Sequence, residues 1–458
     1  MPSVYPFRAV QFTQRPDLST AVAPPYDVLD AGSKQRLLDK NSRNIVAIDL
    51  PHTPAKELGP PAAYQTAADL YRAWLNDGTL KQGDEPAMFA YRQTTRTHDG
   101  KVSQRSGMAC TVDAVAFGPR QGGGILPHEE TFSGPKEDRF ALMKSTKAQL
   151  SPIFGLHADE RGYATKLIQS VMANGKPDIK ADMGDGVLHE VWTITDDQTI
   201  RAYQQALTGE DVFIADGHHR YNTALNYIKH LEAEGGKRLP ADHPARRCMM
   251  VMVGMSDPGL VIWPTHRVLG GMKDYTWEGF LKAAESVVGL SPAGQGKSAL
   301  DVLEDTLEAA NAASSRHLGG RRVLGLYDAA SGQCALATFN EADPLASRFP
   351  EKPKAWRTLD VALVQYSIVE QVCVPALNGG EPVKWAFPHT IKEVEDITKG
   401  SETGAGGGKG FKAQLAVIVP PTPLEAVRDV SRANELMPQK STFFYPKLAT
   451  GLFVNPLE

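Results

Sequence analysis

The most informative segment lies near the middle of the chain. It reads Asp211-Val212-Phe213-Ile214-Ala215-Asp216-Gly217-His218-His219-Arg220-Tyr221-Asn222-Thr223-Ala224-Leu225. An apolar strand over residues 211–215 runs straight into Asp-Gly, and apolar residues then recur from Tyr221 at helical spacing. The sequence therefore predicts a strand, a tight turn and a helix, with the polar residues gathered at the start of the helix.

This turn has the character of an anion site. Asp216 is a natural N-cap, and Gly217 is followed by the free amides and the positive dipole end of the expected helix. His218, His219 and Arg220 add donors at the same place. A cap alone would explain Asp216 and is worth about 1 kcal/mol, but it would not explain the two histidines and the arginine. We therefore expect a phosphate-like group at this turn.

A second polar run enters a helix in the same way, between Leu126 and Arg139. Lys136 and Arg139 are three residues apart and share a helical face, so they could clamp a phosphate or form a solvated helix start. Both alternatives stay open. His128 with Glu129 or Glu130 precedes the helix on a loop, where a general base or a carboxylate beside a metal could lie.

The C-terminal run from Met437 to Leu448 is a short aromatic strand between prolines. Lys440 offers a cation at its start and is a candidate phosphate contact. Residues 443–445 are interpreted as a closing strand whose aromatic side chains fill the core.

Strands and helices alternate through much of the chain, which favours a mixed α/β fold. We expect an N-terminal α/β region over residues 1–120, a central region with both motifs over 121–270, and a C-terminal α/β region over 271–458. One intertwined catalytic unit is the alternative. Among the expected elements are a strand over 44–50, a helix over 62–75, a hairpin of 88–95 with 102–117, and a helix over 358–373.

Composition excludes several classes of protein. The chain has 458 residues, 42% of them hydrophobic, and a net charge of −4, so a wholly disordered chain and a globally basic polyanion binder are both excluded. The four cysteines lack Cys-x-x-Cys spacing, and we expect neither a disulfide framework nor a dedicated zinc site. Without a secretory leader or a long apolar span, we expect a cytoplasmic protein with no membrane or nucleic-acid partner.

Seven segments together resemble the family catalogued as domain of unknown function 1015, over nearly the whole chain. They are Phe7-Arg8-Ala9, Ala23-Pro24-Pro25-Tyr26-Asp27, residues 128–139, Ser151-Pro152-Ile153-Phe154, residues 215–221, Pro264-Thr265-His266-Arg267 and residues 437–448.

The Asp216–Arg220 turn also resembles the core motif of the ParB/sulfiredoxin superfamily, whose members bind nucleotides and include a free-serine kinase. This resemblance implies a ParB/sulfiredoxin-like nucleotide-binding core with additional α/β segments, ATP or ADP with Mg²⁺ as cofactors, and a role for Asp216 near the acceptor hydroxyl. It also implies that Gly217, His218, His219 and Arg220 contact phosphate. The arginine-rich phosphate box and DNA-binding module of the ParB-type proteins are absent. The sulfiredoxin-type proteins are expected to have a catalytic cysteine beside the His-Arg pair, but the cysteine nearest to this pair in the sequence is Cys248.

The function expected is nucleotide-dependent phosphoryl transfer involving a small hydroxylated metabolite, with serine and phosphoserine as the first pair to test. Two alternatives are a ParB-like nucleotide-binding switch without turnover and a metal-assisted phosphomonoesterase. The catalytic candidates are Asp216, Glu129, Glu130 and His128.

Overall fold

The computed structural model describes residues 2–96, 100–130, 133–295, 299–313, 321–400 and 410–458. The chain divides into two units, of which unit 1 comprises Met1–Val261 with Phe444–Glu458, and unit 2 comprises Ile262–Phe443. The regions expected over 1–120 and 121–270 thus share one unit up to Val261, and the last segment of the chain returns to it. Strands β13 (Val261–Trp263) and β20 (Phe443–Tyr445) lie where the chain passes between the units.

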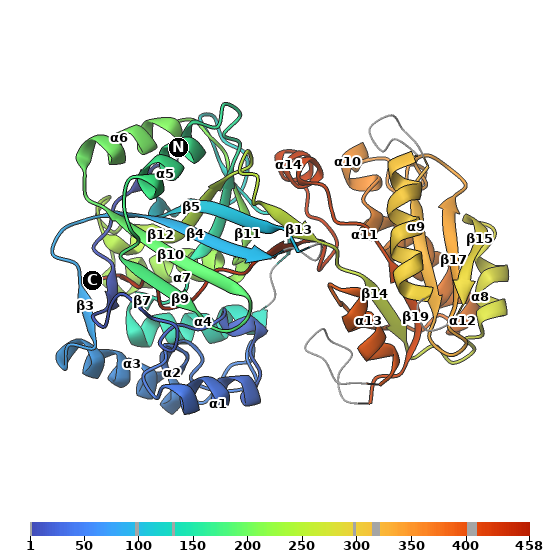
Figure 1. The fold of residues 1–458 in the computed structure, drawn as a ribbon, viewed down its shortest axis with the longest axis horizontal. Helices are drawn as coiled ribbons and strands as arrows, with labels where there is room; N and C mark the ends of the chain where they lie inside the picture. The colour runs from blue at the N-terminus through green and yellow to red at the C-terminus, as the bar shows by residue number, and fades with distance from the viewer. Residues whose placement is uncertain (1, 97–99, 131–132, 296–298, 314–320, 401–409) are drawn as a thin grey trace. The chain divides into compact units, whose positions relative to one another are not determined.

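Both units are mixed α/β, as the sequence predicted (Figure 1). The elements of unit 1 are β1 (Val4–Tyr5), β2 (Val10–Phe12), a 3₁₀ turn (Tyr26–Val28), α1 (Ala31–Lys40), α2 (Val46–Asp49), α3 (Pro61–Asn76), β3 (Leu80–Gln82), β4 (Met88–Arg96), β5 (Val102–Asp113), β6 (Ile125–Leu126), α4 (Ser133–Thr146), β7 (Ala148–Gln149), β8 (Ile153–His157), α5 (Tyr163–Ala173), β9 (Ile179–Asp182), β10 (Val187–Ile194), α6 (Asp197–Ala206), β11 (Val212–Asp216), α7 (His218–Gly235), a 3₁₀ turn (Pro244–Arg246), β12 (Arg247–Gly254) and β21 (Asn455–Pro456).

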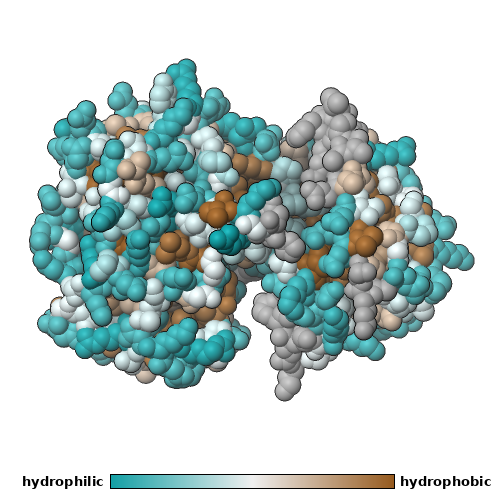
Figure 2. All heavy atoms as spheres, viewed as in Figure 1, coloured by the Kyte–Doolittle hydropathy of each residue, from teal (hydrophilic) through white to brown (hydrophobic). Residues whose placement is uncertain are grey.

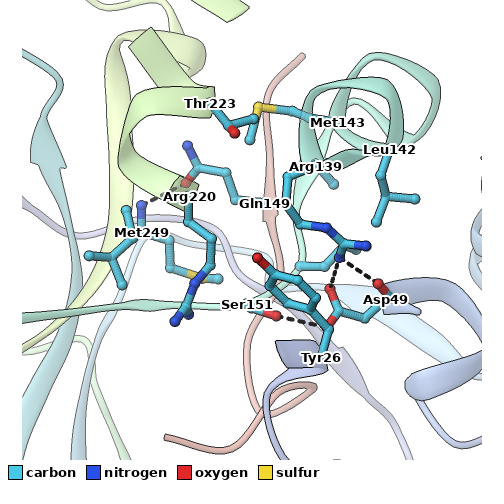
Figure 3. A pocket seen from close by; sticks show the side chains of 13 residues that line it. Tyr26, Asp49, Arg139, Leu142, Met143, Gln149, Ser151, Arg220, Thr223 and Met249 are labelled. Carbon is cyan, nitrogen blue, oxygen red and sulfur yellow. Dashed lines mark hydrogen bonds and ion pairs between the residues drawn. The ribbon is translucent and has the colours of Figure 1, made fainter. Parts of the chain in front are cut away.

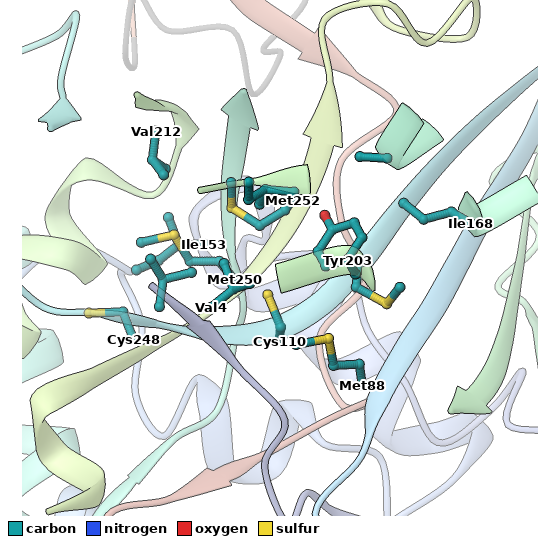
Figure 4. Close-up of a cluster of buried hydrophobic side chains, with 14 of the residues drawn as sticks. Val4, Met88, Cys110, Ile153, Ile168, Tyr203, Val212, Cys248, Met250 and Met252 are labelled. Atoms are coloured by element: carbon teal, nitrogen blue, oxygen red, sulfur yellow. The ribbon is translucent and has the colours of Figure 1, made fainter. Parts of the chain in front are cut away.

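A nine-stranded sheet forms the centre of unit 1, in the order β6-β11-β8-β12-β5-β4-β10-β9 with β1 beside β5. Helices α5 and α6 and the first turns of α7 contribute to the apolar cluster on one face, which includes Met88, Cys110, Ile168, Tyr203 and Met250 (Figure 4). The C-terminal segment contacts aromatic residues of β4, where the Phe453 ring lies 5.1 Å from that of Phe89 and 6.0 Å from that of Tyr91. Phe89 and Tyr91 alternate along β4 with Met88 and Ala90 of the cluster, so the last residues of the chain pack on the opposite face of the sheet.

Unit 2 is built on a six-stranded sheet of order β15-β17-β16-β19-β14-β18, and α9 and α13 contribute to its apolar cluster. Its elements are β14 (Arg267–Gly270), α8 (Trp277–Ala284), β15 (Val288–Gln295), α9 (Ala299–Ala313), β16 (Val323–Asp328), β17 (Gln333–Phe339), α10 (Lys354–Arg357), α11 (Asp360–Leu363), a π-helix (Val364–Cys373), α12 (Val374–Leu377), β18 (Lys384–Ala386), α13 (Ile391–Thr398), β19 (Ala413–Ile418) and α14 (Leu424–Arg432).

One predicted element has the wrong type. Residues 44–50 were expected to form a buried strand, but they contain the short helix α2, which Asn44 precedes. The Asn44 side chain donates to the carbonyls of Thr20 and Val22 and accepts from the Val46 amide, so these contacts replace a strand ladder. A buried apolar run of this length fits either a helix or a strand.

The outer surface of unit 1 carries hydrophilic side chains over most of the face seen in Figure 2. Among the residues that the structure describes, every helix is too short or too polar to span a bilayer.

Candidate functional site

The two polar motifs meet because their strands run in the same direction. Strand β6 is parallel to β11, with Val212 opposite Ile125 and Phe213 opposite Leu126. The chain therefore leaves both strands at the same edge of the sheet, at His128 and at Asp216. Between Ile214 and Asp216 the register with β8 shifts, and such an irregularity re-aims the side chain that follows it.

Gly217 makes the turn into α7. Its φ of 95° lies in the left-handed region, and an added Cβ would lie 3.0 Å from Nε of Arg220. The N-cap of α7 is Gly217 and has no side-chain cap, so the prediction that Asp216 caps the helix is wrong. Asp216 is the last residue of β11 and its carboxylate has other partners.

Those partners are two cations. Oδ2 of Asp216 accepts from Nη2 of Arg220 at 2.6 Å, and Oδ1 accepts from Nζ of Lys447 at 3.0 Å. Arg220 also donates from Nη1 to the carbonyl of Pro152, which precedes β8. Burial opposes ionisation of Asp216, but the charges of Lys447 and Arg220 outweigh it and lower the pKa of the carboxyl well below its usual value. Asp216 is therefore ionised near pH 7.

His128 and His218 form a buried pair beside this carboxylate. Their rings are 4.8 Å apart and edge to face, and the His128 amide donates to Nε2 of His218 at 3.3 Å. His128 Nδ1 lies 2.9 Å from the carbonyl of Ile214, so Nδ1 carries a hydrogen and donates it. Burial lowers the pKa of both histidines. His128 lowers the pKa of His218 further, whereas the Asp216 carboxylate partly opposes the shift of each ring. Both rings are therefore neutral donors and acceptors near pH 7.

The two glutamates of the loop differ in exposure. Glu129 is half-buried and Glu130 is exposed. Glu129 and Asp216 both lie close enough to His128 for their charges to raise the pKa of its ring, against the larger effect of burial. The segments of Glu129 and Asp216 thus converge, and Glu129 is the better placed of the two glutamates to face the site. Their catalytic roles stay predictions.

Lys447 is the site residue that sequence reasoning missed. The same C-terminal run drew attention to Lys440, which is exposed and belongs to unit 2, whereas Lys447 belongs to unit 1 and reaches Asp216. The one signal available was a second lysine in that run, after Pro446. A phosphate contact by Lys440 stays a prediction.

Lys136 and Arg139 start α4 but have different environments. Lys136 is half-buried, whereas only 6% of the Arg139 side chain is exposed. The Arg139 guanidinium donates to the Asp49 carbonyl at 2.6 Å and to the Asp138 carboxylate at 2.8 Å, and lies 3.9 Å from the centre of the Tyr26 ring. It is turned into the protein, so a phosphate role for the Lys136–Arg139 pair stays a prediction that this arrangement does not favour.

A cavity of about 40 Å³ lies beside these groups (Figure 3). Tyr26, Asp49, Arg139, Ser151 and Arg220 are among its lining residues. Ser151 donates to the Asp49 carboxylate at 3.0 Å, and burial raises the pKa of Asp49 against the effect of Arg139. This volume suits a few water molecules, since ligand pockets measure about 300–1,000 Å³. The cavity is too small to hold a nucleotide.

Among the described residues, no cluster of three or more histidine, cysteine or acidic side chains could hold a metal ion. The four cysteines are buried, and burial raises the pKa of each thiol. They therefore offer no reactive thiolate at this site.

Several solved structures show distant similarity to the chain. A free serine kinase in complex with AMP has 12% identity and a TM-score of 0.29, covering 72% of this chain and 88% of its own. SbnI from Staphylococcus aureus, with a C-terminal truncation, has 9% identity and a TM-score of 0.31, covering 73% and 84%. A conserved hypothetical protein from Pyrococcus furiosus has 12% identity and a TM-score of 0.28, covering 72% and 92%.

These TM-scores are too low to support a shared function, so the site itself must carry the functional argument. No curated protein matches the chain. The family described as protein of unknown function DUF1015 matches residues 4–362, which include β6, β11, α4 and α7. This match spans well over half of the sequence, and the chain belongs to that family.

Proposed function

We propose that the chain binds ATP or ADP through its phosphates at the turn after β11 and transfers a phosphoryl group between the nucleotide and a small hydroxylated metabolite. Serine and phosphoserine are the first pair to test. The observation that carries the proposal is the Asp216 carboxylate held between Arg220 and Lys447 at the start of α7. Two cations beside a carboxylate at the start of α7 can bind the charge of a transferred phosphoryl group and accept a proton.

Phosphate recognition would use groups already gathered at this turn. Arg220 and Lys447 supply two positive charges against the single charge of Asp216, and each charge-assisted bond to a phosphate is worth about 1.5–3 kcal/mol. The α7 amides, His218 and His219 add further hydrogen-bond donors. Gly217 lets the backbone come close because it carries no Cβ.

Asp216 is the proposed proton acceptor. The acceptor oxygen forms a bond to the transferred phosphorus as the bond from that phosphorus to the nucleotide breaks, and the hydroxyl proton passes to the carboxylate. While Arg220 and Lys447 hold it, Asp216 is a weak base. A phosphate that draws these cations away would restore its basicity, so that nucleotide binding activates the base. Glu129 is the alternative proton acceptor.

Mg²⁺ brought by the nucleotide would need only one or two carboxylates from the protein. Both oxygens of Asp216 are bound to cations, so Glu129 or Glu130 fits this role better. The ParB/sulfiredoxin-like character of the core is part of the same proposal.

A nucleotide-binding switch without turnover is a second candidate. The lowered pKa of Asp216 favours it, because a carboxylate that is hard to protonate is a poor base unless its cations move.

Phosphorus NMR on the full chain with ATP or ADP, Mg²⁺ and a panel of amino acids separates the candidates. Phosphoryl transfer predicts a new phosphoester signal, a switch predicts shifted nucleotide signals alone, and a phosphomonoesterase predicts free phosphate from phosphoserine. Asp216→Asn should then lower turnover by about 10² to 10⁴ while the nucleotide still binds. An Asn variant with wild-type turnover would move the base assignment to Glu129, to be tested by Glu129→Gln.

A further inference from the structure

Lys447 belongs to the C-terminal segment of unit 1 and follows Asp216 by 231 residues in the sequence. Its ammonium can meet the carboxylate only if the backbone of residues 445–447 is held in place. The structure shows which side chains hold it.

Arg105 of β5 binds two successive carbonyls of this segment. Nη1 donates to the Tyr445 carbonyl at 3.2 Å, and Nη2 donates to the Pro446 carbonyl and to Oε1 of Gln93. Gln93 lies opposite Arg105 in the β4–β5 ladder and donates from Nε2 to the Lys447 carbonyl at 2.7 Å. Three consecutive carbonyls, ending at Lys447, are therefore held by one neighbouring pair of side chains.

Arg105 also contacts the strand that pairs with Asp216. Its guanidinium lies 4.5 Å from the centre of the Phe154 ring, and Phe154 is the register partner of Asp216 between β8 and β11. The Phe444 ring packs edge to face on Phe154 at 5.6 Å. The same side chain thus links the backbone before Lys447 to the strand beside Asp216.

Stability alone does not account for a charge at this place. Arg105 is 2% exposed, and each hydrogen bond that the described residues give it ends on a neutral oxygen. Burial of a guanidinium carries a desolvation penalty, and the hydrogen bonds of Arg105 to backbone carbonyls offset part of it. What an apolar chain cannot do is span two carbonyls with a planar fork.

We propose that Arg105, together with Gln93, is a positioning residue that fixes the Lys447 ammonium beside Asp216. Its consequence for phosphate affinity rests on the proposed function, but the placement of Lys447 can be measured without it.

The test is Arg105→Met in the full chain, with Arg92→Met as the matched control. Arg92 adjoins Gln93 on β4, and like Arg105 it lies over an aromatic ring, but its contacts are Glu190 and Trp192. Acetic anhydride labelling followed by peptide mass spectrometry reports the reactivity of Lys447. We expect severalfold faster acetylation of Lys447 in Arg105→Met and no change in Arg92→Met, with Arg105→Lys between wild type and Arg105→Met.

Equal Lys447 labelling in Arg105→Met and wild type would overturn the proposal. If Arg105→Met fails to fold, Gln93→Leu, which removes the bond to the Lys447 carbonyl, gives the same decision. In a wild type that binds ADP, Arg105→Met should weaken that binding by about tenfold. A wild type that does not bind ADP would refute the proposed function and leave the labelling result to decide the positioning role.

Discussion

Asp216 illustrates how a single carboxylate can be read in two ways. As a helix cap it would bind the amides of α7, whereas both of its oxygens accept hydrogen bonds from Arg220 and Lys447. The strength of these ion pairs depends on pH, because protonation of the Asp216 carboxylate abolishes them.

The pH dependence follows from the direction of the pKa shift. Folding lowers the pKa of Asp216 below the unfolded value of about 3.9, so its stabilisation is fully present above that value and is lost as the pH falls toward the folded pKa. Wild type should therefore be more stable than Asp216→Asn near pH 7, and the difference should shrink below about pH 4. Urea titrations in which unfolding is detected by hydrogen exchange in peptides of unit 1 measure this difference in the free energy of unfolding.

Asp197→Asn is the control, because Asp197 forms an ion pair with Arg201 at the surface and 81% of its side chain is exposed. It should differ little from wild type at any pH. An Asp216→Asn variant as stable as wild type at pH 7 would show that the ion pairs of Asp216 contribute nothing to the free energy of unfolding.

In the strand–turn–helix element, Gly217 adopts a left-handed backbone conformation and also lies against the Arg220 side chain. Gly217→Ala should lose about 1–2 kcal/mol of stability, because an L-residue resists the left-handed conformation. The new methyl group would also press on Arg220, so ADP affinity should fall as well.

Gly184 provides a matched comparison for that variant. Its φ is 81° and an added Cβ meets nothing within 4 Å, so Gly184→Ala should lose similar stability with unchanged ADP affinity. If both variants bind ADP like wild type, the close approach at Gly217 is unrelated to phosphate binding. Thermal denaturation and calorimetric titration provide the two readouts.

Local pattern was sufficient for elements with a strong period or an explicit turn. The helix expected over 62–75 is α3 (Pro61–Asn76), and the hairpin expected from 88–95 and 102–117 is β4 with β5. Local pattern failed at residues 44–50, where hydrogen bonds of the Asn44 side chain stabilise the start of a helix. Turn chemistry also predicted the strand, turn and helix around Gly217, but it predicted Asp216 as the helix cap, whereas the carboxylate binds Arg220 and Lys447.

At the scale of the whole molecule, unit 1 is assembled from two separated stretches of chain. Strand β21 pairs with β7, and Phe453 fills the core against β4, so the last fifteen or so residues belong to a unit that begins at the N-terminus. Long-range placement of this kind has no local signal, which is why Lys447 and Arg105 could not be predicted from sequence.

Asp216, Arg220 and Lys447 are the proposed phosphate site, and calorimetric titration of ADP into wild type and Lys447→Gln is its direct test. Lys147→Gln is the control, since Lys147 is an exposed lysine of unit 1 paired with Glu458. We expect Lys447→Gln to weaken ADP binding by about ten- to a hundredfold, corresponding to one charge-assisted bond, and Lys147→Gln to leave it unchanged. Equal ADP affinity in Lys447→Gln and wild type, or no binding by wild type, would contradict the account.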